Sequence, residues 1–165
     1  ISIATCPSSN LKLGSGIPNV KLMLEQGVNV TIGTDGCASN NNLNMWEEMH
    51  LTSLLNKGLF RDPTAVSAYD VLKMATVNGA RSQGRMDCGM VKEGYRADLI
   101  LIDFDKPHLY PNPNVISNLV YSAQGSDVCM TMCDGKVLYE NGEFKTIDME
   151  KIKAEALRCA QILTK

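Results

Sequence analysis

Residues 28–42 read VNVTIGTDGCASNNN, and this stretch decides the fold class. Its β-branched first half, Val28–Thr34, is typical of a buried strand, and a polar loop follows. Upstream, Ile1–Thr5 is a second apolar run, and a helix that begins near Pro18 and ends at Gly27 separates the two. A strand, a helix and a strand in this order predict a βαβ unit, and therefore a parallel sheet with a right-handed crossover.

The rest of the chain divides into a helical part and a mainly β part. We expect helices over residues 43–57 and 67–78, the first with its apolar side chains on one side and the second with Tyr69 facing inward. Further along, the pattern predicts a strand at 97–104, a loop at 106–117 and a brief apolar segment at 119–123. It then predicts a hairpin at 128–140 around Asp134-Gly135, a strand near 144–146 and a helix over 148–162. The first part is typical of the end of an α/β barrel or a doubly wound sheet.

The composition is that of an ordinary soluble globular chain. Its 165 residues are 44% hydrophobic and 21% charged, with a net charge of -2. This balance gives no basic patch for nucleic acid or an anionic membrane, and no run approaches the roughly 20 apolar residues of a membrane span. Six cysteines without zinc-site spacing, and no secretory signal before Ile1, predict a cytoplasmic protein with free, mostly buried thiols.

Asp35 is the residue most suggestive of chemistry. It follows a buried strand at the edge where the loops of parallel α/β folds meet ligands, and Gly36 frees the backbone beside it. Such a carboxylate can ligate a metal or exchange protons, or it can simply cap the following loop. The spacing alone leaves both interpretations open.

Five segments in order resemble metal-dependent amidohydrolases. They are CPSSNLKLGSGIPNV at 6–20, GVNVTIGTDGCASNNNLNMWEEMHLTSLLNK at 27–57, MATVNGARSQG at 74–84, GYRADLILIDFDKPHLYP at 94–111 and LVYSAQGSDVCMTMCDGKVLYENGEF at 119–144. The resemblance is closest to the 5-methylthioadenosine/S-adenosylhomocysteine deaminase group, with guanine deaminases and triazine chlorohydrolases as relatives.

The resemblance implies an α/β fold, the C-terminal portion of a (β/α)8 amidohydrolase barrel plus part of a small β-sandwich with a terminal helix. Residues 1–85 would form the last strands and helices of the barrel, residues 86–147 part of the composite sandwich, and residues 148–165 the C-terminal helix. A barrel of this class takes about 250 residues. Because the chain also opens on a strand rather than on Met, we expect it to be a piece of something longer.

For the site, the resemblance implies that Asp35 is a ligand of one divalent metal and also takes a proton from the attacking water. Zinc is expected, with iron and manganese left open, and the reaction replaces the amino group at C6 of an adenine nucleoside. The family's metal histidines and proton-shuttling glutamate belong to earlier strands, and neither His50 nor His108 is expected to replace them. One carboxylate cannot hold a catalytic zinc, so the chain alone is expected to bind no metal and to be inactive.

Some neighbours of Asp35 stay ambiguous. Thr5 stands where relatives commonly have His, which puts a polar role of that position in doubt. Cys6 and Cys37 flank the expected site, as reactive thiols or as small buried side chains. Residues 40–42, all Asn, can orient substrate, support Asp35 or only stabilise the loop.

Two further hypotheses compete with the deaminase. One is a hydrolase of another heteroaromatic substrate, such as guanine or a triazine. The other is a non-catalytic or split-subunit module that self-associates through the strand edge beside Ile1 and the helix from Leu43. In either case we expect a homo-oligomer, or association with the missing N-terminal part.

Overall fold

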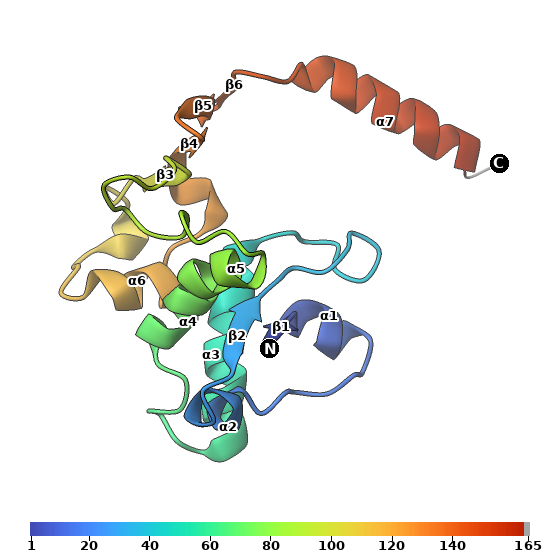
Figure 1. The fold of residues 1–165 in the computed structure, drawn as a ribbon. Coiled ribbons are helices and arrows are strands. Elements are labelled where there is room, and N and C mark those ends of the chain that lie inside the picture. Colours follow the sequence, from blue (N-terminus) through green and yellow to red (C-terminus); the bar gives the residue numbers. More distant parts are fainter. Residues whose placement is uncertain (164–165) are drawn as a thin grey trace.

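The computed structural model describes residues 1–163 and begins with a parallel strand pair (Figure 1). Strands β1 (Ser2–Thr5) and β2 (Asn29–Ile32) pair from Ser2↔Asn29 to Thr5↔Ile32. Helix α2 (Val20–Glu25) lies between them in sequence, so the predicted βαβ unit is confirmed. Its first turn is capped by the side chain of Asn19, which accepts from the amide of Leu22 at 2.9 Å.

One helix of this unit was not predicted. Residues 7–12, for which the sequence pattern predicted no helix, form α1 (Pro7–Lys12). A helix of six residues has little stability of its own, and α1 depends on partners elsewhere in the fold. Pro7 occupies its first position, and the amide of Ser8 donates to a carboxylate oxygen of Glu48, 40 positions away.

Helix α3 (Met45–Phe60) differs from prediction in its end and in its buried face. It continues through Gly58 and ends where Arg61 adopts a left-handed φ of 51°. Leu43 and Leu54, two of the apolar residues predicted to share one side of the helix, are exposed, while Met49 is buried. The buried residues are mostly polar instead: Glu48, Met49, Thr52, Ser53 and Asn56. Each polar one has a hydrogen-bond partner, which makes its burial tolerable.

The core lies between β2 and the helices that contact it. Its buried members come from β2, from helices and from the segment between α3 and α4: Val20, Val30, Ile32, Met49, Val66, Val71, Met74 and Val120. Helix α4 (Ala68–Ala75) begins at the predicted cap, where the Ser67 hydroxyl accepts from the amide of Asp70. Tyr69 is 57% exposed, so its predicted inward position is wrong. Helix α5 (Val77–Ser82) follows directly and contacts β2.

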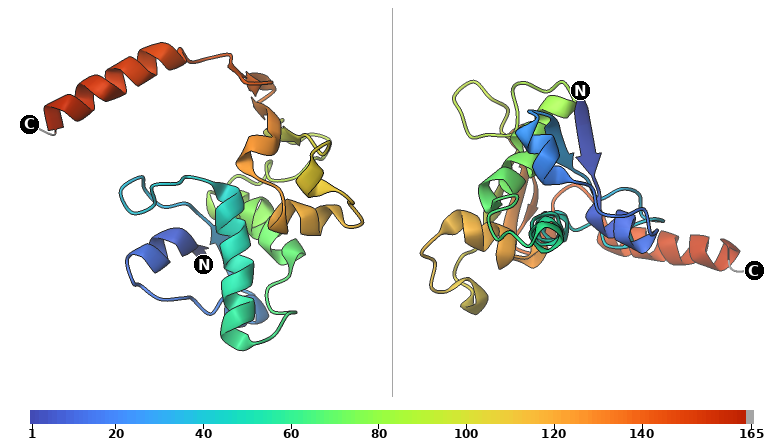
Figure 2. Two further views of the ribbon diagram at one scale, coloured as in Figure 1. Left: turned by 180° about the vertical axis from the view of Figure 1, so that it is seen from behind. Right: turned by 90° about the horizontal axis from the view of Figure 1, so that it is seen from below.

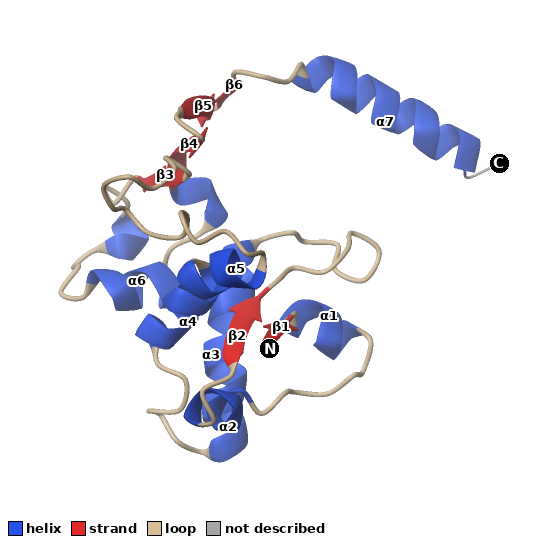
Figure 3. Cartoon of the chain, in the orientation of Figure 1, coloured by secondary structure: helices blue, strands red, loops and turns tan. Residues whose placement is uncertain are grey.

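The second part of the chain is an antiparallel sheet of order β3-β4-β5-β6 (Figure 3). The strands are β3 (Leu99–Ile102), β4 (Val128–Cys133), β5 (Lys136–Glu140) and β6 (Glu143–Phe144). The predicted hairpin is confirmed, with positive φ at both Asp134 and Gly135. Short 3-10 turns occupy Pro107–Leu109 and Gly125–Asp127.

Between β3 and β4 the predicted loop and brief apolar segment were partly wrong, because α6 (Val115–Tyr121) forms there. The side chain of Asn114 caps it by accepting from the amide of Ser117 at 3.0 Å, and Val120 is buried in the core. The pattern missed this helix because prolines and asparagines precede it and only one of its residues is buried.

Helix α7 (Met149–Leu163) extends away from the rest of the chain (Figures 1 and 2). Asp148 caps it as predicted, accepting from the amide of Lys151. None of its residues is buried. The last two residues of the predicted 148–165 segment lie outside the described residues.

The cysteines and the membrane prediction can be compared directly with the structure. All six thiols are free, as predicted, but only Cys88 is buried, so the expectation of mostly buried thiols is wrong. Within residues 1–163, no helix has the length and apolar character needed to cross a bilayer.

Candidate active site

Asp35 lies just beyond the carboxyl end of β2. Gly33 prolongs the strand pairing, since its amide donates to the carbonyl of Thr5 at 2.9 Å. Asp35 then adopts φ 59°, a left-handed conformation that Asp tolerates better than most residues because its short side chain can hydrogen-bond nearby backbone. Here Oδ1 accepts from the amide of Gly36 at 2.8 Å. The turn presents the carboxylate to solvent at the edge where α/β folds bind ligands.

The second oxygen of Asp35 is held from a different element. The hydroxyl of Ser9, on α1, donates to Oδ2 at 2.6 Å. Hydrogen bonds from Ser9 first, then from Ser39 and the Gly36 amide, hold the pKa of Asp35 below its ordinary value. The side chain is therefore a carboxylate at neutral pH, able to accept a cation or a proton.

A buried pair of polar residues supports the loop that carries Asp35. Asn40 is buried, and its Nδ2 donates both to the carbonyl of Thr34 at 2.9 Å and to Oε1 of Glu48 at 2.7 Å. Asn41 and Asn42 are exposed and bond to neighbouring loop residues and to Lys12. Of the three asparagines, Asn40 is thus the one that braces the backbone next to Asp35.

This arrangement is matched by a known family. The model for the amidohydrolase family matches residues 1–138. The chain belongs to the amidohydrolase family. The family predicted from the sequence motifs is therefore confirmed, and with it the fold class, a portion of a (β/α)8 amidohydrolase barrel with part of a small β domain. The domain boundaries at residues 85 and 147 stay a prediction.

Curated relatives of this amidohydrolase chain are nucleoside deaminases. It is 54% identical over all 165 residues to a 5-methylthioadenosine/S-adenosylhomocysteine deaminase of Dictyoglomus thermophilum, of which it covers 39%. It is 52% identical over 163 residues, 99% of its length, to a 5'-deoxyadenosine deaminase of Methanosarcina acetivorans, of which it covers 38%. The chain thus spans about two fifths of the length of these relatives.

Solved structures show the same fold. An adenosine deaminase from Xanthomonas campestris with bound zinc superposes with a TM-score of 0.95 at 36% identity, covering 99% of this chain and 38% of that one. An atrazine chlorohydrolase from Arthrobacter aurescens TC1, complexed with zinc, gives 0.87 at 28% identity, covering 95% and 35%.

Thr5, Cys6 and Cys37, whose roles the sequence left open, differ in their exposure in this amidohydrolase chain. Thr5 is 3% exposed, and its hydroxyl has no hydrogen-bond partner among the described residues. Burial, followed by the charge of Asp35, raises the pKa of the Cys6 thiol, which disfavours the reactive thiolate. A Cβ added at Gly33 would lie 3.2 Å from the Cys6 sulfur, so Cys6 fills a tight slot. Cys37 is exposed on the loop.

Both histidines have other neighbours. The ring of His50, on α3, meets that of Tyr121 edge-on, with 6.1 Å between the ring centroids. Nε2 of His108 lies 2.9 Å from Oδ2 of the buried Asp127, next to the antiparallel sheet. These contacts give each histidine a structural role.

The described residues can be compared with what a metal ion requires. Within residues 1–163, no three His, Cys, Asp or Glu side chains converge to hold an ion. The ionised, exposed carboxylate of Asp35 nevertheless suits a divalent cation, since its two oxygens offer about four lone-pair sites, more than its protein donors occupy. Asp35 therefore fits a metal as one member of a larger ligand set.

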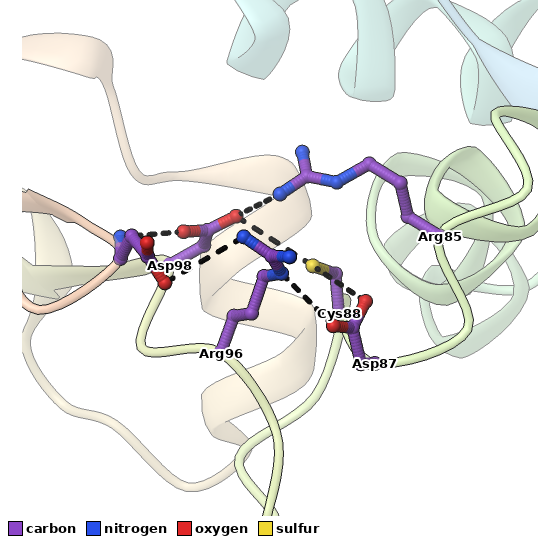
Figure 4. A network of polar contacts seen from close by, with 6 residues as sticks. Arg85, Asp87, Cys88, Arg96 and Asp98 are labelled. Carbon is purple, nitrogen blue, oxygen red and sulfur yellow. Dashed lines mark hydrogen bonds and ion pairs between the residues drawn. The ribbon is translucent and has the colours of Figure 1, made fainter.

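A second polar cluster, shown in Figure 4, fastens the antiparallel sheet to the segment after α5. Arg85 pairs with Asp98 at 2.6 Å, and Arg96 pairs with Asp87 at 2.9 Å. The amide of Asp134, in the hairpin, donates to Asp98 at 2.8 Å and is the largest cause of the lowered pKa of Asp98. The carboxylates of Asp87 and Asp98 are each paired with an arginine, so the cluster connects the sheet to the preceding segment and offers no free carboxylate for a metal.

Ser9 and Glu48 were not singled out from the sequence. Ser9 lies within CPSSN, where both serines belong to a helix that the pattern did not predict. Glu48 follows Glu47 in the first turn of α3, where acidic residues are common because they favour the helix dipole. The sequence therefore does not distinguish the two residues, although Glu47 is exposed and Glu48 is fully buried.

Proposed function

We propose that this amidohydrolase chain is part of a metal-dependent deaminase of adenine nucleosides of the 5'-methylthioadenosine/S-adenosylhomocysteine type. The observation that carries the proposal is the 54% identity to the Dictyoglomus thermophilum deaminase over the whole chain. Since the chain covers 39% of that relative, the activity is assigned to the complete protein. Water is the attacking nucleophile of the reaction, and the substrate is a small molecule.

Asp35 is proposed as one ligand of a single divalent metal, with zinc favoured over iron or manganese because zinc is bound in similar structures. When bound, such a metal lowers the pKa of a coordinated water to about 7. The chain's own residues keep the carboxylate ready for this task. Ser9 and the Gly36 amide orient its two oxygens, and the lowered pKa keeps it ionised until it accepts a proton.

In the proposed reaction the oxygen of water forms a bond to C6 of the adenine ring. The bond from C6 to the exocyclic nitrogen then breaks, and ammonia leaves with the proton that Asp35 accepted from water. The deaminase relatives named above share the adenine ring in their substrates and differ at the 5' position. The proposal therefore assigns the reaction to the adenine ring, and the assay below distinguishes the 5' groups.

The test uses the complete protein encoded by the reading frame that contains these residues. Ammonia release is measured with 5'-methylthioadenosine, S-adenosylhomocysteine, 5'-deoxyadenosine and guanine, and chloride release with atrazine, before and after metal removal by a chelator. Release from the adenine nucleosides that depends on metal supports the proposal. Turnover of guanine or atrazine alone would show that the protein is a hydrolase of another heteroaromatic substrate. The absence of turnover with every compound would favour the non-catalytic module.

A further inference from the structure

We propose that Glu48 is a positioning residue for Asp35, an inference that rests on the function proposed above. Glu48 is fully buried, and its carboxylate accepts from two donors on different elements. Burying a carboxylate is costly unless its oxygens are hydrogen-bonded, so the arrangement is expected to serve a purpose. One donor, the Ser8 amide, is next in sequence to Ser9, which donates to Asp35. The other, Asn40, also donates to the carbonyl of the residue before Asp35.

The first route passes through α1. Oε2 of Glu48 accepts from the amide of Ser8 at 3.1 Å. The next residue is Ser9, whose hydroxyl donates to Oδ2 of Asp35 at 2.6 Å. Because α1 is a short helix, an anchor on its first turn fixes where the Ser9 hydroxyl points.

The second route passes through the loop after β2. Oε1 of Glu48 accepts from Nδ2 of Asn40 at 2.7 Å, and the same nitrogen donates to the carbonyl of Thr34 at 2.9 Å. Thr34 is the residue before Asp35. The loop is closed around this point, because the amide of Asn40 also donates to the carbonyl of Gly36 at 2.8 Å.

The chemistry of the two routes requires a carboxylate at position 48. Both of its partners are N–H donors, so both of its oxygens must accept. A glutamine offers one acceptor and one NH2 group, and the NH2 would face another donor. Asn40 cannot turn its amide over to compensate, because its Oδ1 accepts from the amide of Asn42 at 3.0 Å. Whichever way its amide points, Glu48→Gln therefore loses one of the two hydrogen bonds, to Asn40 or to Ser8.

The experiment measures zinc affinity in the complete protein by chelator competition. Glu48→Gln is compared with Glu47→Gln, a matched control one position away on the exposed side of the same helix turn. Groups that orient metal ligands typically contribute 10- to 100-fold to affinity, and we expect Glu48→Gln to weaken zinc binding by roughly tenfold or more. Glu47 accepts from the exposed side chain of Asn42 and not from Ser8 or Asn40, so Glu47→Gln is expected to leave the affinity unchanged.

Asn40→Ala and the double variant test the route itself. If Glu48 acts through Asn40, Asn40→Ala weakens zinc binding as well, and adding Glu48→Gln to it causes little further loss. Asn40→Ala also keeps the proposal testable if Glu48→Gln folds poorly. Thermal unfolding of every variant is recorded, because a merely structural role lowers the unfolding temperature while the folded protein keeps its zinc affinity.

The outcomes separate the two proposals. A wild-type protein that neither holds a metal nor releases ammonia would overturn the proposed function and this inference with it. A metal-loaded, active wild type whose Glu48→Gln variant binds zinc normally would overturn the role of Glu48 alone. Where Glu48→Gln does not fold, normal zinc binding by Asn40→Ala would do so instead.

Discussion

The hydroxyl of Ser9 donates a 2.6 Å hydrogen bond to Oδ2 of Asp35, and this contact joins the helix after β1 to the loop after β2. It is also the largest cause of the lowered pKa of Asp35. We therefore predict that Ser9→Ala raises the pKa of Asp35 toward the ordinary value of about 3.9, as measured by carboxyl carbon NMR titration.

The neighbouring serine provides the control for this measurement. The Ser8 hydroxyl is buried and has no hydrogen-bond partner among the described residues, so Ser8→Ala should leave the Asp35 titration unchanged. Equal shifts in both variants would contradict the assignment. The lowered pKa of Asp35 also stabilises the folded state at pH values above the pKa of the unfolded chain. This contribution to stability is lost as the pH falls through the pKa of the folded state.

The 165-residue chain by itself is predicted to bind zinc no better than a peptide with one carboxylate, and to show no deaminase activity. The reason is that Asp35 has no two further ligands nearby within residues 1–163, while catalytic zinc takes three protein ligands. Isothermal titration with zinc chloride checks this. Stoichiometric uptake by the purified chain would contradict it.

The same chain is predicted to self-associate. Ile1, just before β1, and Ile3, within it, are exposed, and the outer edge of β1 has no partner strand among the described residues. Leu43 is exposed near α3. An unpaired strand edge with apolar side chains favours association with a second copy. Size-exclusion chromatography with light scattering should give a mass above 18 kDa, and a clean monomer would contradict the prediction.

Asp62 provides a pH test of stability away from the site. The Thr64 hydroxyl, 2.6 Å away, and the Lys21 ammonium, 2.9 Å away, hold the pKa of Asp62 well below its usual range. Asp62→Asn should therefore lower the urea midpoint at pH 7. The difference from wild type should shrink below about pH 3.9, where the unfolded state takes up the proton. A difference that stays constant down to pH 3 would show that Asp62 acts by other means.

Several elements could be predicted because their signals are local. The β-branched run before Asp35, the Asp134-Gly135 turn and the Ser67 cap each depend on a few adjacent residues, and all three are confirmed. The position of Asp35 at a strand end followed from the same local pattern, and so did the family motif around it.

The rest depends on contacts between distant residues. Helix α1 forms against Glu48, and the buried face of α3 is polar because its side chains bond to other segments, such as Ser53 to the carbonyl of Val66. Apolar periodicity predicts the opposite face of α3, since it treats polar residues as exposed. For the same reason, the sequence did not reveal Ser9 and Glu48 as partners in the site.

Gly89 is predicted to be the glycine where alanine is tolerated least. It has φ 87°, and a Cβ there would lie 2.8 Å from the Cα of Val77 and 3.0 Å from the carbonyl oxygen of Thr76, closer than backbone atoms allow. Gly94 is the matched control, with φ 80° but open space around the added atom. Gly94→Ala carries the cost of the left-handed backbone alone, about 1 kcal/mol. Gly89→Ala adds a collision with backbone that cannot move aside, so we expect it to lower the free energy of unfolding by more than about 2 kcal/mol. Urea unfolding of both variants checks this, and equal losses would show that the segment around Gly89 yields to the added methyl group.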